Sequence, residues 1–365
     1  MMFLNTEISK YISIAFLVSI FITFATFSSV IFVGDLVENS KKLSSTEYNS
    51  IGLLISLSIL NLPKMLVEIL PFTVLFAGML WTLRFNNSKE LLIMRSAGIP
   101  LIKVCIPIMF VSMMIGIVFV IIFTPLISAT QKKIQKIENI KLGKPITSLL
   151  VSNTGFWLKQ ESNGGSEIIY AKKLDTTNMT LVDVLVFRFN KKNEVQYRLK
   201  ADSSQLENDY WLLKNIELYN MKGEKSYKNY ERLPTSITNS QIKEGFSSPE
   251  TISIWNLLPF IKLFKKAGFS AKKHQLYFYK LLFFPLYLGG MALLGTSFNI
   301  NSHSRKANNL RNLCGVIVGF VIFYTTKVIG ALALSGKVAL IFSSLIPASI
   351  PFLIGLILIL YADEK

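Results

Sequence analysis

The stretch Asn87-Ser88-Lys89-Glu90-Leu91-Leu92-Ile93-Met94-Arg95-Ser96-Ala97-Gly98-Ile99-Pro100 stands between two long apolar runs. It carries the signals of a short helix. Asn87 can cap its first turn together with Glu90, and Gly98 followed by Pro100 can end its last turn. About ten residues cannot cross a bilayer, which needs roughly 20 apolar residues. The stretch therefore predicts a helix over about 88–97 at a membrane surface, between two spanning helices.

This short helix combines charged residues with an apolar face, which Leu92 borders and Ala97 extends. Two interpretations fit such a helix. It can be an interfacial connection that only joins two spans, or a docking helix offered to a partner on that side of the membrane. The residues expected to contact such a partner are Lys89, Glu90, Leu91, Met94 and Arg95.

The composition is typical of an integral membrane protein. Of 365 residues 51% are apolar, and the mean hydropathy is +0.45. The net charge of +17 can reflect orientation, anionic lipid or nucleic acid, but no compact basic module or recognition motif favours nucleic acid. Cys105 and Cys314 are expected to be reduced thiols near the cytoplasmic side, so no disulfide framework is predicted.

Six apolar runs are long enough to cross a bilayer. A polar loop is expected over 34–50, after the first run. In the second run, counting 20 residues of roughly 1.5 Å each back from Arg84 places Lys64 at the far interface. The alternative is a snorkelling lysine that only marks the boundary. Residues 51–62 of this run, which at 51–83 is too long for one perpendicular span, are then expected along or above the interface. The predicted spans cover 11–33, about 64–83, 104–123 (ended by Thr124-Pro125), 275–297, 313–334 and 338–361.

The centre of the chain has a different pattern. Between 131 and 273 the apolar runs shorten and apolar residues alternate with polar ones, which is typical of strands. Several short strands at this spacing predict an all-β sandwich or jelly roll. Residues 254–266 predict an amphipathic helix that leads back to the membrane. The predicted strands are 155–158, 167–170, 181–189, 195–199 and 210–213.

Within the strand 181–189, the two-residue period predicts that one face points inward and the other outward. The inward residues are Val182, Val184 and Val186, and the opposite ones are Leu181, Asp183 and Leu185. Such a strand can line a slot for acyl chains. Because both of its faces are apolar, it can equally be a core strand covered by a second sheet.

Charge decides the predicted orientation. Six spans put both termini on one side, and the short loops of that side are strongly basic with the single acid Glu90. By the positive-inside rule the termini and the short helix are cytoplasmic, and the β domain is extracytoplasmic. The basic residues of the cytoplasmic loops are Arg84, Lys89, Arg95, Lys103, Arg305, Lys306 and Arg311. The opposite loops hold Lys41, Lys42 and Lys337, offset by Asp35, Glu38 and Glu47.

The motifs of common enzymes are missing from the sequence. It contains no Gly-x-x-x-x-Gly-Lys-Ser/Thr phosphate loop, so ATP cannot bind by that route. His274 and His303 are predicted on opposite sides of the membrane, which excludes an ordinary zinc site or a Ser/His/Asp arrangement. We therefore predict a non-catalytic membrane subunit that itself binds no cofactor or metal.

Three spans, a large extracytoplasmic β domain and three more spans resemble the LptF/LptG family of lipopolysaccharide export permeases of Gram-negative bacteria. The resemblance covers the whole chain, and Trp157 with Lys266-Ala267-Gly268 brings it closer to the LptG half of the family. The chain departs from that half at Ile31-Phe32-Val33, where a basic residue is usual. The matching motifs are Leu62-Pro63-Lys64, Leu70-Pro71, Ser88-Lys89-Glu90-Leu91, Ser96-Ala97-Gly98, Gly155-Phe156-Trp157-Leu158-Lys159, Phe284-Pro285-Leu286, Gly319-Phe320-Val321, Phe323-Tyr324, Gly330 and Pro347-Ala348-Ser349.

The resemblance implies an α-helical inner-membrane protein with six transmembrane helices and an inserted periplasmic, jelly-roll-like β domain. The expected domains are 1–125, which includes a coupling helix at about 88–97, then 126–273 and 274–365. The implied partners are an LptF-like permease, an LptB-like ATPase dimer that uses ATP, and LptC-like and LptA-like periplasmic β proteins. The chain is then expected to extract lipopolysaccharide from the outer leaflet of the inner membrane and pass it to this periplasmic bridge.

Lipopolysaccharide carries phosphates at the outer face of the inner membrane, so a cavity for it needs cations at that interface. The expected lipid-binding residues are Lys41, Lys42, Lys64, Lys132, Lys133, Lys136 and Lys327. For the group from Lys132 to Lys136 a solvated helix face is an equal alternative, and Lys327 can instead snorkel. Two other functions stay open at this point: an ABC-type extruder of lipoproteins or peptides, and a non-transporting envelope scaffold.

Overall fold

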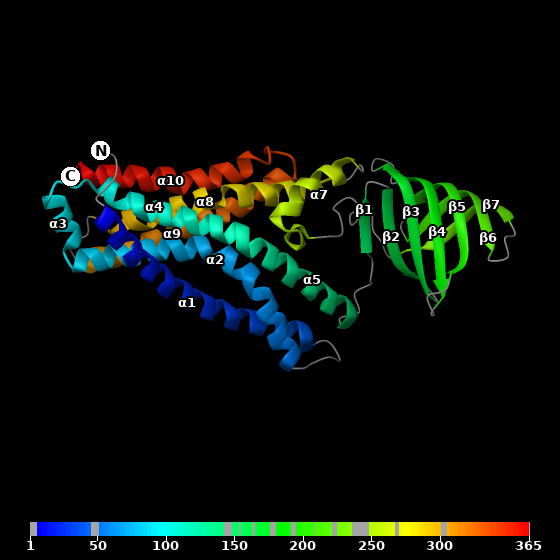
Figure 1. The fold of residues 1–365 in the computed structure, drawn as a ribbon, viewed down its shortest axis with the longest axis horizontal. Coiled ribbons are helices and arrows are strands. Elements are labelled where there is room, and N and C mark those ends of the chain that lie inside the picture. The colour runs from blue at the N-terminus through cyan, green and yellow to red at the C-terminus, as the bar shows by residue number, and fades with distance from the viewer. Residues whose placement is uncertain are drawn as a thin grey trace. The chain divides into compact units, whose positions relative to one another are not determined.

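The computed structural model describes residues 6–44, 51–141, 148–152, 155–162, 165–175, 180–190, 195–207, 209–220, 225–235, 248–266, 270–300 and 305–364. Contacts between residues divide the chain into two compact units. One joins Met1–Gln131 with Leu276–Lys365, and the other is Lys132–Gln275. Figure 1 shows that the first unit is helical and that the second contains the sheet.

Six helical segments in the described part of the chain are long and apolar enough to cross a membrane: Thr6–Lys41, Ile51–Asn87, Leu101–Gln135, Lys272–Asn299, Arg311–Leu334 and Phe342–Asp363. The predicted class, six spanning helices with an inserted β domain, is confirmed. The helices are α1 (Thr6–Ser44), α2 (Ile51–Asn87), α3 (Glu90–Ser96), α4 (Leu101–Val118), a π-helical turn (Phe119–Phe123), α5 (Thr124–Lys141), α7 (Ile254–Lys266), α8 (Lys272–Asn299), α9 (Arg305–Leu334) and α10 (Phe342–Asp363).

The loop predicted from residue 34 is wrong over its first part, because α1 continues to Ser44. Buried hydrogen bonds explain the extension. The Asp35 carboxylate accepts hydrogen bonds of 2.8 Å from Asn39 and, across to α2, of 2.8 Å from Asn61. Asn39 also donates to Ser58 at 2.9 Å. These partners satisfy polar groups that the sequence alone assigned to a solvated loop.

The third predicted span does not end at Thr124-Pro125. The π-helical turn Phe119–Phe123 widens the backbone ladder directly before Pro125, and α5 then continues to Lys141. A proline ring collides with the carbonyl four residues earlier in a regular helix, and a π-helical turn relieves this crowding. The Thr124 hydroxyl also donates to the Val120 carbonyl within this turn.

Helices α2 and α8 approach each other closely at small residues. A Cβ added to Gly295 would meet the carbonyl oxygen of Leu75, and one added to Gly78 would lie 3.0 Å from that of Ala292. The Thr82 hydroxyl donates across the same contact to Thr296 at 3.2 Å. Close backbone approach and interhelical hydrogen bonds are what hold helices together in lipid, where apolar area alone does not.

The sheet contains seven strands in the described residues, ordered β1-β2-β3-β4-β5-β6-β7, with every neighbouring pair antiparallel. The five predicted strands lie inside β2 to β6, whereas β1 and β7 were not predicted. The sequence left the strand order open. The strands are β1 (Ser148–Ser152), β2 (Gly155–Ser162), β3 (Gly165–Asp175), β4 (Thr180–Asn190), β5 (Val195–Leu206), β6 (Tyr210–Asn220) and β7 (Lys225–Pro234).

A crease crosses the sheet and shifts the side-chain alternation by one residue. In β4, Leu181, Val184 and Val186 are buried, whereas Val182 is 44% exposed. The prediction that Val182 points inward and Leu181 outward is therefore wrong. Asp183, at φ 59°, adopts the left-handed conformation that aspartate and asparagine tolerate best among non-glycine residues. Asp183 is left out of the pairing with β3 and with β5, but the register is the same on both sides of it. The left-handed backbone at Asp183, and not an inserted residue, therefore shifts the alternation.

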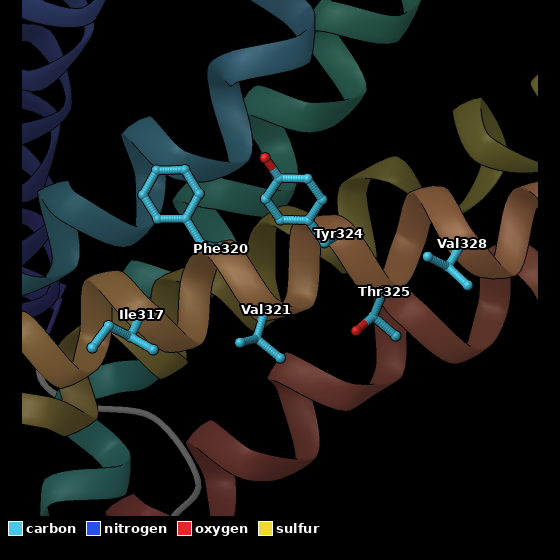
Figure 2. A pocket seen from close by; sticks show the side chains of 6 residues that line it. All are labelled: Ile317, Phe320, Val321, Tyr324, Thr325 and Val328. Carbon is cyan, nitrogen blue, oxygen red and sulfur yellow. The ribbon is translucent and has the colours of Figure 1, made fainter.

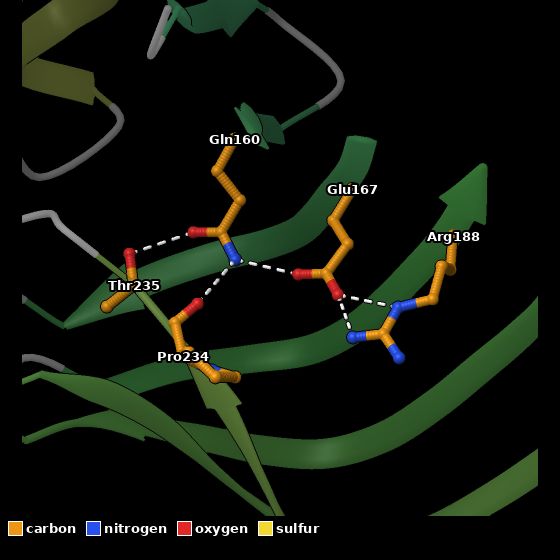
Figure 3. A network of polar contacts seen from close by, with 5 residues as sticks. All are labelled: Gln160, Glu167, Arg188, Pro234 and Thr235. Atoms are coloured by element: carbon orange, nitrogen blue, oxygen red, sulfur yellow. Dashed lines mark hydrogen bonds and ion pairs between the residues drawn. The ribbon is translucent and has the colours of Figure 1, made fainter. Parts of the chain in front are cut away.

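The sheet also rolls over on itself, so that the end of β7 meets β2. Gln160 of β2 donates to the Pro234 carbonyl at 3.1 Å and accepts from the Thr235 hydroxyl at 2.8 Å. Gln160 also donates to Glu167, whose fully buried carboxylate pairs with Arg188 (Figure 3). Over its described residues the β domain is therefore one rolled sheet, and the alternative prediction of two sheets packed as a sandwich is wrong.

Glu167 is expected to stabilise this rolled arrangement. Glu167→Ala removes the buried carboxylate to which both Arg188 and Gln160 donate, and breaking a buried pair from one side costs about 3–5 kcal/mol. Amide hydrogen exchange of the full chain should then rise in β2 and β7 and stay unchanged in α8. Lys228→Ala is the matched control, because the Lys228–Glu231 pair is exposed and should contribute little. Equal exchange in both variants would contradict this role.

Candidate functional site

The short helix α3 begins differently from the predicted cap. Asn87 is the last residue of α2, and Lys89, at φ 62°, reverses the chain direction before α3 starts at Glu90. No described side chain caps this turn. Glu90 instead accepts a 2.7 Å hydrogen bond from the Ser88 hydroxyl. The predicted capping role of Asn87 is thus wrong, because helix α2 already uses this residue in its last turn.

The end of α3 follows the prediction. Gly98 lies at φ 76°, its N–H donates to the Arg95 carbonyl at 2.9 Å, and the Ile99 N–H donates to Met94 at 3.1 Å. These two bonds form a Schellman motif, which requires a left-handed residue and so favours glycine. Pro100 then precedes α4 in extended conformation.

The apolar face of α3 packs against its own chain. Leu91 is 2% exposed and belongs to the helical core, and Met94 packs against the same cluster. Leu91 is therefore not available to a partner, which corrects its predicted docking role, whereas Met94 stays partly exposed and its predicted contact remains a prediction. Leu92 and Ile93 are 60% and 63% exposed and form the free apolar area of this helix.

Polar contacts connect α3 to the first and last helices of the chain. The Tyr11 hydroxyl of α1 donates to Glu90 at 3.0 Å. Arg95 reaches the Ala362 carbonyl of α10 at 3.5 Å. Displacing α3 would therefore pull directly on α1 and α10.

A second candidate surface lies on α9. Five exposed side chains and one half-buried side chain of this helix line an open groove of about 470 Å³. In Figure 2, Phe320 and Tyr324 project from one side of α9, and Ile317, Val321, Thr325 and Val328 follow along the helix. All but Thr325 and the Tyr324 hydroxyl are apolar, so the groove suits hydrocarbon chains.

An ion pair lies beside this groove. Lys327 of α9 and Glu68 of α2 stand 3.9 Å apart, and both side chains are about half exposed. The Lys327 ammonium also lies 5.2 Å from the centre of the Phe323 ring. Phe72 of α2 packs on Phe320 and Phe323 at 5.3 and 5.2 Å between ring centres. Apolar area and a cation thus occur together on this surface.

The other predicted lipid-binding lysines are distributed over three helices. Lys64 is half-buried in α2, one turn before Glu68, whereas Lys132 and Lys133 are exposed on α5. Lys41 is exposed near the end of α1, in a helix and not in the predicted loop. Lys42 of α1 and Lys136 of α5 have side chains outside the described part of the structure.

Two arrangements of polar side chains were not predicted from the sequence. The spacing of Lys64 and Glu68 suggests one helix face, but only the contact between α2 and α9 shows that Glu68 pairs with Lys327. The network of Asp35, Asn39 and Asn61 was missed because polar residues after an apolar run indicate a loop. The sequence did contain a signal for part of this network: Asp35 and Asn39 are four residues apart, which places them on one face of a helix.

Comparisons with known proteins agree with this architecture. Residues 10–361 match the family model described as lipopolysaccharide export system permease LptF/LptG. The lipopolysaccharide export system permease protein LptG of Haemophilus influenzae is 24% identical over 350 residues, which cover 94% of this chain and 95% of that protein. LptG of Escherichia coli K12 is 22% identical over 367 residues, covering 97% and 98%.

The corrected face of α3 can be checked by cysteine labelling. In a Cys314→Ser background, which removes the exposed native thiol and keeps the buried Cys105, Ile93→Cys should react rapidly with a water-soluble maleimide. Leu91→Cys should react at least about tenfold more slowly, since modification requires local opening of the core. The labelling rates are read by mass spectrometry. Similar rates at the two positions would show that α3 presents Leu91 after all.

Proposed function

This chain belongs to the LptF/LptG family of lipopolysaccharide export system permeases, and we propose that it takes the LptG position, paired with an LptF-like second permease. It is a multi-pass inner-membrane protein and a lipopolysaccharide export permease subunit. The family match over residues 10–361 shows the family, and the observation that supports the LptG position is the likeness to LptG proteins. Both relatives named above are LptG proteins that cover nearly the whole chain.

ATP hydrolysis is assigned to a separate, LptB-like ATPase dimer, and this chain is assigned no catalytic role and no cofactor of its own. We propose α3 as the docking helix for that ATPase. Support comes from its exposed Leu92 and Ile93, flanked by Lys89, Glu90 and Arg95. Movement of the ATPase would reach α1 through the bond between Glu90 and Tyr11, and α10 through Arg95.

The proposed orientation puts both termini and α3 in the cytoplasm and the β domain in the periplasm. It rests on the positive-inside rule applied to the short loops. The β domain would pass lipid to LptC-like and LptA-like β proteins. The inward side chains of β4 are fully buried, so acyl chains could enter the rolled sheet only if it opens. A route along the outside of the sheet needs no such opening.

Lipopolysaccharide would first meet the α9 groove with its acyl chains and the nearby lysines with its phosphates. The groove is apolar, and Lys327 is half exposed beside it. Because Lys327 already forms an ion pair with Glu68, that carboxylate would compete with a phosphate for this cation. Lys64 lies one turn from Glu68 and is the second cation proposed for this surface. Lys41, Lys42, Lys132, Lys133 and Lys136 are kept as proposed headgroup contacts.

The proposal is tested by purifying the tagged chain from its native membrane and identifying bound proteins and lipids by mass spectrometry. An LptG subunit should bring a second six-span chain, an ATPase and lipopolysaccharide. Recovery of an ATPase with lipoproteins or peptides would favour an extruder, and recovery of envelope proteins without an ATPase would favour a scaffold. Either result would overturn the proposal.

Ile93→Asp should weaken binding of the ATPase. An apolar interface residue contributes roughly 1–3 kcal/mol, so the retained ATPase should fall about tenfold or more. The measurement is the ATPase-to-permease ratio after purification, together with lipopolysaccharide-stimulated hydrolysis. Ser96→Asp on the same helix is the control, since this residue is exposed but offers no apolar area. Leu91→Asp would instead place a charge in the core of this chain and report on folding.

Lipid contact at α9 predicts an asymmetric effect of breaking the ion pair. With a photoreactive residue at Val321, Lys327→Gln should lower crosslinking to lipopolysaccharide by up to about tenfold, the worth of one charge-assisted bond. Glu68→Gln breaks the same pair but leaves the cation available, so crosslinking should be kept or increased. Equal losses in both variants would mean that the pair only holds α2 and α9 together.

A further inference from the structure

Helix α7 connects the sheet to the span α8, and one of its faces is fully packed. Leu257, Ile261 and Phe264 are buried on this face. His274, in the first turn of α8, is also fully buried, with its ring centre 4.9 Å from that of Phe260 and 5.6 Å from that of Phe264. This aromatic cluster holds α7 against the beginning of α8.

The side of α7 next to this packed face is exposed and carries a continuous stripe, and Asn256 and Pro259 are exposed beyond it. Trp255 is 64% exposed and Leu258 is 44% exposed, and Lys262 and Lys265 are exposed further along the helix. Their spacing of three, four and three residues places the four side chains on one side of a helix, next to the side that Leu257 and Ile261 bury. We call Trp255, Leu258, Lys262 and Lys265 the α7 stripe. Its first half is apolar and its second half is basic.

The position of α7 in the chain brings this stripe to a bilayer surface. Only residues 267–271 separate α7 from α8, and Lys272–Asn299 is long and apolar enough to span a membrane. The packing of α7 on His274 adds a contact with the first turn of α8 to this short connection. From Thr251 to Lys280 the sequence contains six lysines and no acid, so the surroundings of the stripe attract anions.

We propose that the α7 stripe binds the surface of the bilayer at the level where α8 begins, with Trp255 and Leu258 in the interfacial region and Lys262 and Lys265 on the headgroups of anionic phospholipids. Tryptophan prefers this region because its ring is amphipathic. Lysines near the bilayer surface bind anionic lipids electrostatically. The α7 stripe thus anchors the connection between the β domain and the membrane, independently of the lipid that the protein exports.

The residue types of the α7 stripe indicate whether a bilayer surface or bulk water surrounds it. Water solvates the two lysines, but it gives no advantage to a tryptophan and a leucine exposed next to each other. An interfacial helix gains from this combination of apolar anchors and lysines, and its remaining apolar side is here packed within the protein.

Spin labelling of the full chain in lipid nanodiscs tests the proposal. In the Cys314→Ser background, nitroxides are attached at Leu258→Cys, at Val321→Cys on the apolar α9 face and at Tyr230→Cys on β7, all exposed in the structure. Collisions with oxygen and with a water-soluble nickel chelate are measured for each. The label at 258 should resemble that at 321, with oxygen favoured several-fold, and the label at 230 should favour nickel.

The contribution of charge is measured in the same system without lipopolysaccharide. Nanodiscs of phosphatidylcholine are compared with nanodiscs that also contain phosphatidylglycerol, and the label at 258 should lie deeper in the second kind. Lys262→Glu with Lys265→Glu should abolish that difference. Because both lysines are exposed, the double variant should fold normally, and the unchanged label at 321 verifies this.

Three results would overturn the proposal. A label at 258 that behaves like that at 230 would place the α7 stripe in water. A label shielded from both oxygen and nickel would mean that protein covers it. If neither phosphatidylglycerol nor the double substitution changes the depth of the label at 258, the two lysines do not bind anionic headgroups. None of these results depends on transport, so the proposed function stands or falls separately.

Discussion

The hydrocarbon core of a bilayer contains no water, so a polar group there needs a hydrogen-bond partner within the protein. This requirement explains much of the helical unit. Where two helices cross, hydrogen bonds must be completed within the chain, as between Thr82 and Thr296 or between Asp35 and Asn61. The same constraint explains the glycines of the contact between α2 and α8. In lipid, helices gain little from burying apolar area, and therefore close approach at Gly78 and Gly295 has to supply the attraction.

The β domain is stabilised by a different driving force. Its strands fold in water, so burial of apolar side chains such as Leu158, Trp211 and Leu233 drives its formation. A rolled sheet has two ends that must meet, and the buried polar cluster of Gln160, Glu167 and Arg188 provides a directional contact there. Burial alone does not select which strands meet, whereas hydrogen bonds have fixed geometry.

Three of the surfaces that the described residues leave exposed carry the functions proposed for this protein. They are the exposed part of α3, the apolar groove on α9 and the α7 stripe. Each combines apolar side chains with nearby charge, but the polar groups differ: Glu90 and Arg95 are bonded to α1 and α10, Lys327 is paired with Glu68, and Lys262 and Lys265 are exposed. The first two suit surfaces that respond to a partner or a lipid. The third suits a static anchor.

The sequence by itself determined the six spans, the inserted β domain and the end of α3 at Gly98, because apolar length, alternation and a left-handed glycine are local properties. Only the tertiary structure decided which face of each element is free. The amphipathic pattern of α3 marks Leu91 and Met94 as apolar, but not whether their own core or a partner buries them. Likewise, a single residue at Asp183 reversed the facing of Val182, and the pairing of Glu68 with Lys327 depends on two helices that are distant in sequence. Such contacts arise from packing between elements. The periodicity of one helix or strand shows its apolar face but does not show which other element covers that face.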